Sequence, residues 1–515
     1  MRGGALLHKR WFRQILRRRV FVILLLVVQG LVLIGLISNA SQLALWVDRG
    51  FRLLSVLVGL RVVSSRDKPT YKLLWIVLFL VFPVFGGLFY LLISFQQSTR
   101  WAKDRLEQLE QDSRPLLKAG SAYDAACRSM PERVPQLRYL QAAGFPVYGS
   151  TICDYFSPGE QVFAALLPEL EKAERYIFLE FFIIQEGVMW NAIHDILREK
   201  ARRGVTVRVL YDDLGSFLTL PKDYASQLER EGIQCRVFNP FRPVLSSIQN
   251  NRDHRKIVSI DGKIAFTGGF NLADEYINAV EKHGHWKDAG IRLRGGAAWS
   301  LTLMFLQMWG LASRTQEDLS QFLPSGMIPD PADADGFVQP YADSPLDKEN
   351  TGEHVYLQII NNAKQYVYIN TPYLIVDDSM VSALSLAAKS GVDVRIVTPH
   401  HWDKWVIHMT TRAYYRSLLD AGVKIYEYTP GFLHAKTFVS DDEVATVGTI
   451  NLDYRSLYLH FECGAVLYRS RAVEQVKDDF LRTLKSCQEV TPADCRHRLP
   501  FRLFQEILRL FAPLM

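Results

Sequence analysis

Paired cysteines and a strong excess of one charge are both missing from this 515-residue chain. It contains six cysteines, and none of them forms a Cys-x-x-C pair. Structural zinc sites usually need such pairs, so we expect free thiols and no bound metal. The formal net charge of +6 is modest for this length. Proteins that bind nucleic acid usually carry a denser basic face, so we expect no nucleic-acid partner.

Charged residues are also missing from two long stretches near the N-terminus. The stretches Val20 to Ser38 and Leu73 to Phe95 contain no Asp, Glu, Lys or Arg. Runs of about 20 apolar residues are long enough to cross a bilayer as helices. Between them, Leu43 to Val63 is apolar but carries one Asp and three Arg, so a third span, a re-entrant piece and an interfacial helix are all open. We predict a membrane anchor over residues 1–98 with two or three hydrophobic segments.

Basic residues beside these stretches bear on the orientation of the anchor. Residues 1–19 include seven Lys and Arg and no acidic residue. The positive-inside rule therefore places this end in the cytoplasm. Residues 61–72 and 100–105 are basic as well, so the charges do not decide between two spans and three, nor on which side the rest of the chain lies. Anionic membrane lipids are the simplest partners for such basic flanks.

One pattern of residues occurs twice, with identical spacing and 180 positions apart. Each copy has a His, then a Lys, an Asp, a Gly and an Asn. The first copy consists of His254, Lys256, Asp261, Gly268 and Asn271, and the second of His434, Lys436, Asp441, Gly448 and Asn451. Such a repeat is very unlikely to arise by chance, so we expect both copies to contribute to one site.

Two such copies provide the groups that phosphodiester chemistry requires. Two lysines would neutralise the phosphate oxygens, which is the main help a protein can give to such a transition state. One neutral histidine can attack phosphorus, and the other can protonate the leaving alkoxide and then deprotonate the incoming alcohol. Asn271 and Asn451 can hold the same oxygens, and the small residues Gly269 and Thr449 would let the backbone approach them closely.

Three further carboxylates are candidates whose role is less clearly indicated. Asp261 and Asp441 belong to the repeated pattern, but each precedes a turn, so hairpin capping competes with catalysis. Glu180 lies within the apolar run 175–184. A buried carboxylate is costly unless it is paired, so we expect Glu180 to face the site.

The rest of the chain predicts a duplicated α/β unit. Strands are expected over 175–184, 205–211, 365–373 and 392–397, with helices over 191–203 and 383–389. Strand–helix–strand alternation indicates a mixed or parallel sheet with helices outside it. We therefore predict an α/β fold of two lobes related by a pseudo-twofold axis, preceded by transmembrane helices. The seam between the lobes is the expected active site.

These patterns also predict domain boundaries. We expect a charged helix and linker over 99–145, lobe 1 over 146–323, an interlobe linker rich in Asp, Pro and Gly over 324–350, and lobe 2 over 351–490. Residues 491–515 contain a helix whose apolar face would lie on the bilayer or pack on the protein's own core. The longer segment Phe241–Asp253 is a candidate gate for substrate or an ordinary variable loop.

The repeated pattern and the segments around it resemble the phospholipase D superfamily, and within it the bacterial cardiolipin synthases. The segments that carry the resemblance include Asp253-His-Arg-Lys-Ile-Val258, Gly284-His-Trp-Lys-Asp288, Thr371-Pro-Tyr373 and Thr429-Pro-Gly-Phe-Leu-His-Ala-Lys436. The resemblance implies two phospholipase D-type lobes and a mechanism without cofactor or metal. It also implies a carboxylate oriented toward each histidine, a role that we assign to Asp288 and Glu462.

The same resemblance implies an activity and a location. The chain would be a phosphatidyltransferase of the bacterial cell membrane, anchored by several spans. It would transfer a phosphatidyl group from one phosphatidylglycerol to another through a phosphatidyl-histidine, giving cardiolipin and glycerol. His254 would be the nucleophile and His434 the acid and base, but the symmetry of the two copies leaves the reverse order open.

Other functions compete with this hypothesis. The same residues would serve a phospholipase or nuclease that uses water as the acceptor, and a non-enzymatic lipid-binding membrane protein is a second alternative. A synthase that uses a CDP-activated lipid is disfavoured, because the Asp-Gly-x-x-Ala-Arg signature is absent. Five other histidines match no metal-site spacing: His283, His285, His400, His401 and His408. The sequence predicts no oligomeric state.

Overall fold

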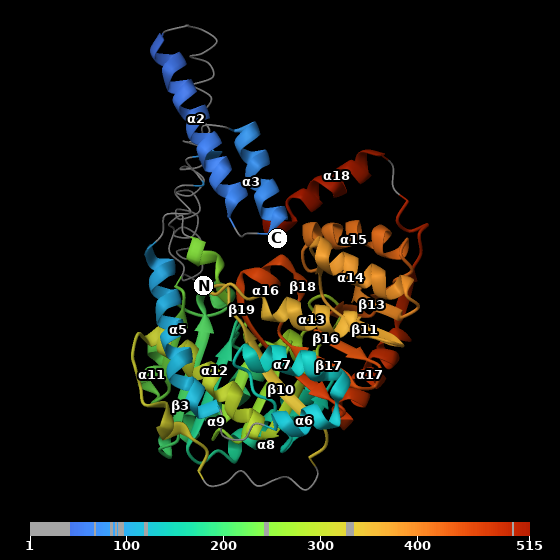
Figure 1. Ribbon diagram of the computed structural model, residues 1–515. Coiled ribbons are helices and arrows are strands. Elements are labelled where there is room, and N and C mark those ends of the chain that lie inside the picture. Colours follow the sequence, from blue (N-terminus) through green and yellow to red (C-terminus); the bar gives the residue numbers. More distant parts are fainter. Residues whose placement is uncertain are drawn as a thin grey trace. The chain divides into compact units, whose positions relative to one another are not determined.

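The structure is a computed structural model of the whole chain (Figure 1). It describes residues 42–65, 68–82, 86–87, 90, 97–117, 122–240, 247–325, 334–496 and 499–514. Two compact units are distinguished, one comprising residues 1–101 with 241–250, and the other comprising 102–240 with 251–515.

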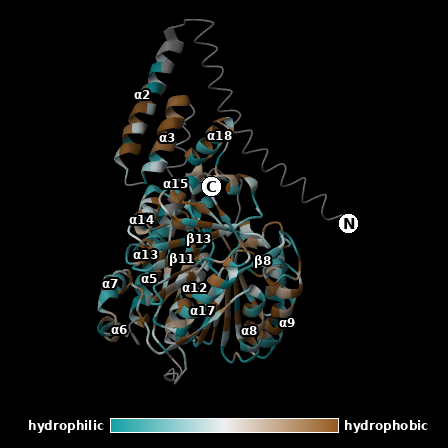
Figure 2. Ribbon diagram, turned by 90° about the vertical axis from the view of Figure 1, so that its right-hand side faces the viewer, coloured by the Kyte–Doolittle hydropathy of each residue, from teal (hydrophilic) through white to brown (hydrophobic). Residues whose placement is uncertain are grey.

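The first unit contains the helices α2 (Gln42–Ser64) and α3 (Pro69–Val81), of which α3 is largely hydrophobic (Figure 2). Val58 and Val62 of α2 pack with Phe79 of α3. Among the described residues, no helix combines the length and the hydrophobicity needed to cross a bilayer. The expected span over 20–38 and much of the run 73–95 lie outside the described residues, so the number of spans stays a prediction.

Of the candidate gate, residues 241–246 also lie outside the described residues, and Ser247–Asn250 form the short helix η2. The role of segment 241–253 as a gate stays a prediction.

The second unit contains two mixed sheets built in the same way, so the predicted α/β duplication is confirmed. The first has the strand order β1-β9-β7-β6-β2-β3-β4. Its strands are β1 (Thr151–Phe156), β2 (Tyr176–Phe181), β3 (Thr206–Asp212), β4 (Gln234–Phe238), β6 (Ile257–Ile260), β7 (Ile264–Gly268) and β9 (Gly290–Gly295). Strands β2, β3 and β4 are parallel, and the remaining neighbours are antiparallel.

The second sheet repeats this arrangement in the order β10-β19-β17-β16-β11-β13-β14-β20. Its strands are β10 (Phe337–Asp343), β11 (Tyr366–Asn370), β13 (Asp393–Pro399), β14 (Lys424–Tyr428), β16 (Thr437–Ser440), β17 (Val444–Gly448), β19 (His460–Tyr468) and β20 (Cys487–Val490). Strands β11, β13 and β14 are parallel, as their counterparts are in the first sheet. The added antiparallel strand β20 extends this edge.

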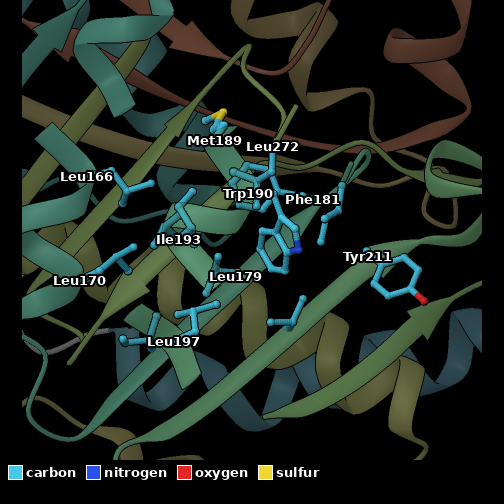
Figure 3. Packing of buried hydrophobic residues seen from close by; sticks show 14 of the residues in the cluster. Leu166, Leu170, Leu179, Phe181, Met189, Trp190, Ile193, Leu197, Tyr211 and Leu272 are labelled. Atoms are coloured by element: carbon cyan, nitrogen blue, oxygen red, sulfur yellow. The ribbon is translucent and has the colours of Figure 1, made fainter. Parts of the chain in front are cut away.

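Helices cover the first sheet on both faces, which explains why every residue of its central strand is buried. Residues 177, 179 and 181 of β2 pack with α8 (Gly159–Glu171) and α9 (Val188–Arg202), as Figure 3 shows for Leu179 and Phe181. On the other face, Phe178 stacks on Phe305 of α12 (Gly296–Ser313) with ring centroids 4.7 Å apart. Helix α12 is almost wholly buried and belongs to the core.

The two sheets share one hydrophobic core. A single cluster of buried residues includes Ile257 and Ile291 of the first sheet together with Val397, Val439 and Val447 of the second. Helix α17 (Arg471–Leu484), which packs on the second sheet, also contacts β1 of the first, and α12 correspondingly contacts β10. The two lobes therefore pack as one body.

Two short parallel pairings also join the lobes at the repeated pattern. Strand β5 (Arg252–Asp253), directly before the first histidine, pairs with the start of β19 in lobe 2. Strand β15 (Gly431–Leu433), directly before the second histidine, pairs with β8 (His285–Lys287) of lobe 1. Each histidine is therefore held against a segment of the opposite lobe.

Two of the expected linker segments contain regular secondary structure. Part of the expected interlobe linker forms the edge strand β10, where Pro340 is tolerated because an edge strand can lack an N–H donor. Much of 99–145 is helical, in α5 (Gln97–Leu117), α6 (Tyr123–Ser129) and α7 (Val134–Ala142). Pro135 lies in the first turn of α7, where proline is favoured. The other expected boundaries stay predictions.

The C-terminal helix α18 (Leu499–Leu510) is amphipathic and packs on α15 (Trp405–Leu419). Phe504 stacks near Trp405 at 5.9 Å, and Arg509 lies over the ring of Tyr414. Its other face leaves Leu503 and Ile507 exposed. Packing on the protein's own core is therefore observed, and contact with a bilayer stays a prediction.

Candidate active site

His254 forms a hydrogen-bonded pair with a carboxylate of the opposite lobe. Its Nδ1 lies 2.8 Å from Oε1 and 3.0 Å from Oε2 of Glu462, which is fully buried on β19. The backbone N–H of His254 also donates to the carbonyl of Phe461 at 2.9 Å. Thr449 donates its hydroxyl to Glu462 as well, so the carboxylate is held from two sides.

His434 forms the matching pair in the other direction. Its Nδ1 lies 2.7 Å from Oδ2 of Asp288, which is fully buried and directly follows β8. The backbone N–H of His434 donates to the carbonyl of Lys287 at 2.7 Å. A Cβ atom at Gly269 would lie 2.1 Å from Oδ1 of Asp288, so only glycine leaves room for this carboxylate.

The two pairs thus cross the seam between the lobes, which the sequence did not reveal. A neutral imidazole that donates its Nδ1 proton to a carboxylate keeps a lone pair on Nε2, where it can attack phosphorus or accept a proton. Burial raises the pKa of Glu462 well above its ordinary value, while Lys256 opposes this shift. His254 and Glu462 therefore share one proton between them.

Both lysines of the pattern are buried beside their histidines. Lys256 Nζ donates to the carbonyl of His254 at 2.6 Å, and Lys436 Nζ lies 2.7 Å from His434 Nδ1. Burial lowers the pKa of Lys256 to about 8 and that of Lys436 to about 7. A bound phosphate would favour their charged forms, because an opposite charge at short range stabilises an ammonium group.

The charges of the two motifs act on one another. Burial lowers the pKa of His254 well below its ordinary value, and Lys256, Lys436 and His434 lower it further. Burial, and then Lys436, lowers the pKa of His434 to about 4, although Asp288 opposes this. Both rings are therefore neutral near pH 7, as a nucleophile or general base must be. The two motifs therefore lie close enough for their charges to interact.

Asp261 and Asp441 lie away from the histidines, and their contacts are those of the capping role that competed with catalysis in the sequence. Asp261 accepts hydrogen bonds from the backbone N–H groups of residues 174–176, each at 2.8 Å, at the beginning of β2. Asp441 accepts from residues 364–366 at the beginning of β11 in the same way. Since β6 and β16 run antiparallel to these strands, each Asp lies at the end opposite its His. Both cap strand ends.

Each of the two asparagines of the repeated pattern already makes at least one hydrogen bond within the protein. Asn271 accepts from the N–H of Ile183 at 3.1 Å and donates to Tyr276 at 2.7 Å. Asn451 donates to Asp453 at 3.0 Å, and its Oδ1 is buried without a partner among the described residues. Contact of these amides, or of the backbone at 269 and 449, with phosphate stays a prediction.

Glu180 lies on β2, paired with Ile257 of β6, which directly follows Lys256. It is fully buried on β2, and burial raises the pKa of its carboxyl well above the ordinary value, with the Asp253 carboxylate adding to this shift. Asp253 directly precedes His254, and burial raises its pKa to about 6. A direct contact of Glu180 with substrate stays a prediction.

Two aromatic residues beside the histidines were not foreseen as site residues. The ring of His460 lies 5.6 Å from that of His254, and the ring of Trp286 lies 5.2 Å from that of His434, centroid to centroid. Each stands two positions before the carboxylate of its segment, in His-Phe-Glu462 and in Trp-Lys-Asp288. This shared position could have identified them in the sequence.

Comparisons with known proteins identify the family of this chain. A family model described as "Cardiolipin synthase, PLD-like domain" matches residues 166–282 and 356–484, and one described as "Phospholipase_D-nuclease N-terminal" matches residues 53–94. The chain is similar in fold to the crystal structure of a phosphatidylserine synthase from Haemophilus influenzae. The TM-score is 0.54 at 13% identity, covering 70% of this chain and 95% of that one.

Relatives of similar length extend the likeness over nearly the whole chain. An uncharacterized protein of Streptococcus mutans is 45% identical over 463 residues, 88% of this chain and 99% of its own. A cardiolipin synthase of a Geobacillus species is 37% identical over 481 residues, 90% and 94% of the two chains. One of Halalkalibacterium halodurans is 33% identical over 513 residues, 97% and 100%. The chain therefore belongs to the family of cardiolipin synthases with phospholipase D-like domains.

Proposed function

We propose that this chain is a cardiolipin synthase, a phosphatidyltransferase that moves a phosphatidyl group from one phosphatidylglycerol to another. The observation that carries the proposal is the crossed arrangement of two histidine–carboxylate pairs, with a buried lysine beside each histidine. Such a set has a nucleophile, an acid–base group and two cations at one place, as transfer at a phosphodiester requires.

In the first step His254 Nε2 attacks the phosphorus of a phosphatidylglycerol. The bond from phosphorus to the glycerol head group breaks, and His434 gives a proton to the departing glycerol oxygen. The negative charge of the bound phosphate offsets the lysines that lower the pKa of His434, and so favours the protonated ring that this step needs. Glycerol leaves, and the phosphatidyl group remains on His254.

In the second step a hydroxyl group of another phosphatidylglycerol attacks the phosphatidyl-histidine. His434 takes the proton of this hydroxyl, the phosphorus–nitrogen bond breaks, and cardiolipin leaves. Lys256 and Lys436 neutralise the phosphate oxygens in both steps. Glu462 and Asp288 keep the imidazoles oriented and stabilise the positive charge that each ring acquires.

A lipid acceptor fits the composition of this chain better than water. The N-terminal residues combine hydrophobic stretches with basic flanks, which favours a place at an anionic membrane surface. In the second unit, Leu503, Ile507 and Trp405 are exposed around α18 and α15, as residues that contact a lipid surface would be. We propose a location at the bacterial cell membrane and phospholipid partners rather than nucleic acid.

The proposal is tested by the products that the purified full-length chain makes from phosphatidylglycerol alone. Cardiolipin and glycerol are expected. Phosphatidic acid and glycerol would instead identify water as the acceptor and a phospholipase. A lipid-binding role would be favoured if the wild type showed no turnover and if cells that carry His254→Ala did not differ from cells that carry the wild type.

A further inference from the structure

A third imidazole lies beside the catalytic pair. His460 is the first residue of β19, two positions before Glu462. Its side chain is only 10% exposed, and its Nδ1 is 3.9 Å from the nearest oxygen of Glu462, which is too far for a hydrogen bond. Within the described part of the chain, neither ring nitrogen has a hydrogen-bond partner. Buried polar atoms are nearly always satisfied, so these nitrogens indicate a ligand.

Positive charges surround this ring. Burial lowers the pKa of His460 well below its ordinary value, and Arg455, Lys256 and Arg252 lower it further. The ring is therefore neutral and offers one N–H donor and one lone pair. Lys256 also lowers the pKa of His254, whose ring centroid is 5.6 Å from that of His460, so both imidazoles lie within the influence of this ammonium group.

The matching position of lobe 1 is occupied by a different side chain. Trp286 stands two residues before Asp288 and packs beside His434. Its Nε1 is buried and, among the residues described, has no partner either, but an indole can only donate. The two halves of the site are therefore chemically unlike, with a polar imidazole on the side of His254 and a larger, mostly apolar indole on the side of His434.

A metal ion is the alternative ligand at this place. His254, His460 and Glu462 offer three ligand atoms within 4.8 Å of one another. A divalent cation there would be repelled by the cations that surround His460, and it would have to displace the hydrogen bonds that Glu462 accepts. The same charges attract an anion. The electrostatics therefore favour a phosphate oxygen as the partner of His460.

We propose that His460 donates a hydrogen bond to a non-bridging oxygen of the phosphoryl group as that group is transferred to His254. This inference rests on the proposed phosphatidyl-His254 intermediate and adds a neutral donor to its phosphate site. His460 forms no covalent bond and transfers no proton. Its contribution is to stabilise charge that develops on the phosphoryl oxygens, which is where a donor in a water-poor site has most effect.

The test compares His460→Phe, which keeps a ring of similar size without a donor, with His460→Asn, which keeps an N–H donor. Two quantities are measured on the purified full-length protein. One is the single-turnover rate at which phosphatidylglycerol labelled in its phosphatidyl part forms a protein adduct, and the other is inhibition by orthovanadate. His401→Phe is the matched control, since His401 is exposed and its ring contacts only His400 among the described aromatic rings.

Removal of one hydrogen bond to a charged group should slow adduct formation by about 10- to 100-fold in His460→Phe and weaken vanadate inhibition to a similar extent. His460→Asn should retain most of both, and His401→Phe should match the wild type. The melting temperature of each variant establishes that it is folded.

Three results would overturn the inference. One is adduct formation and vanadate inhibition in His460→Phe equal to those of the wild type. Another is an equal loss of both in His460→Phe and His460→Asn while the melting temperature is unchanged. The third is stoichiometric zinc binding that blocks the wild type and is lost in His460→Phe, which would identify a metal site. Release of phosphatidic acid by the wild type would refute the proposed acceptor alone, because adduct formation and vanadate inhibition would still test His460.

Discussion

Replacement of Gly269 by alanine should disrupt the hydrogen-bonded pair of His434 and Asp288, although neither of these residues is itself replaced. The added Cβ atom would lie 2.1 Å from Oδ1 of Asp288 and 3.0 Å from the carbonyl oxygen of His434. Real contacts of a Cβ atom are essentially never shorter than 3.0 Å, so the carboxylate must move by about 1 Å, which is the difference between 3.0 and 2.1. The other carboxylate oxygen of Asp288, Oδ2, lies 2.7 Å from His434 Nδ1, so such a shift breaks this hydrogen bond or turns the imidazole ring of His434.

A misplacement of this size lowers catalytic rates by roughly 100-fold, and overpacking of a buried site costs about 1–3 kcal/mol of stability. Steady-state kinetics of cardiolipin formation measures kcat/KM, and thermal unfolding measures the stability. Gly149→Ala is the control, because its Cβ atom would contact Ala122 and Phe337 at an ordinary 3.4 Å. A Gly269→Ala protein with nearly wild-type kcat/KM would refute the requirement for a closely packed Asp288.

Three further outcomes follow from the same contacts. Glu462→Gln should lower kcat about 100-fold or more, because an amide fixes the wrong tautomer of His254. A higher KM with an unchanged kcat would contradict this role. Asp261→Ala should leave kcat nearly unchanged but lower the free energy of unfolding by about 2–3 kcal/mol, since three backbone N–H groups lose their acceptor; denaturant titration measures this, and a large loss of kcat with unchanged stability would restore a catalytic role. The profile of kcat/KM against pH should fall on its alkaline side as Lys436 and Lys256, with pKa values of about 7 and about 8, lose their charge, and an alkaline limb near pH 10 would contradict this. Because the pKa of an unfolded lysine is about 10.4, the unfolded state binds more protons over this range, and these two residues make stability rise with pH from about 7 to 10.

Much of the fold could be predicted from local patterns. The apolar run 175–184 contains β2, and the helix expected over 191–203 is α9. The strand is indicated by its nearly continuous apolar residues, and the helix by its helical spacing and the glycine that follows it. Strand β10 was missed because its apolar residues lie between Asp- and Pro-rich segments and because Pro340 argues against a central strand. Its pairing with β19 is a long-range contact that no local pattern reveals.

The candidate site was predictable in its residue types but not in its connections. The repeated spacing identified the histidines and lysines, and the resemblance pointed to Asp288 and Glu462. Which carboxylate serves which histidine depends on the pairings of β5 with β19 and of β15 with β8, which join segments about 200 and 150 residues apart in the chain. The same limitation applies to Asp261, whose capping partners come from the beginning of another strand.

In the proposed mechanism two imidazoles from different lobes act on one phosphorus atom. The most direct test of this mechanism is the identification, by mass spectrometry, of the covalent adduct that forms when labelled phosphatidylglycerol is mixed with the wild type, His254→Ala and His434→Ala. The wild type should form a phosphatidyl group on His254. His254→Ala should form none, and His434→Ala should not release the group to an acceptor. The mechanism would be contradicted if His254→Ala or His434→Ala still made cardiolipin while no adduct formed on its remaining histidine.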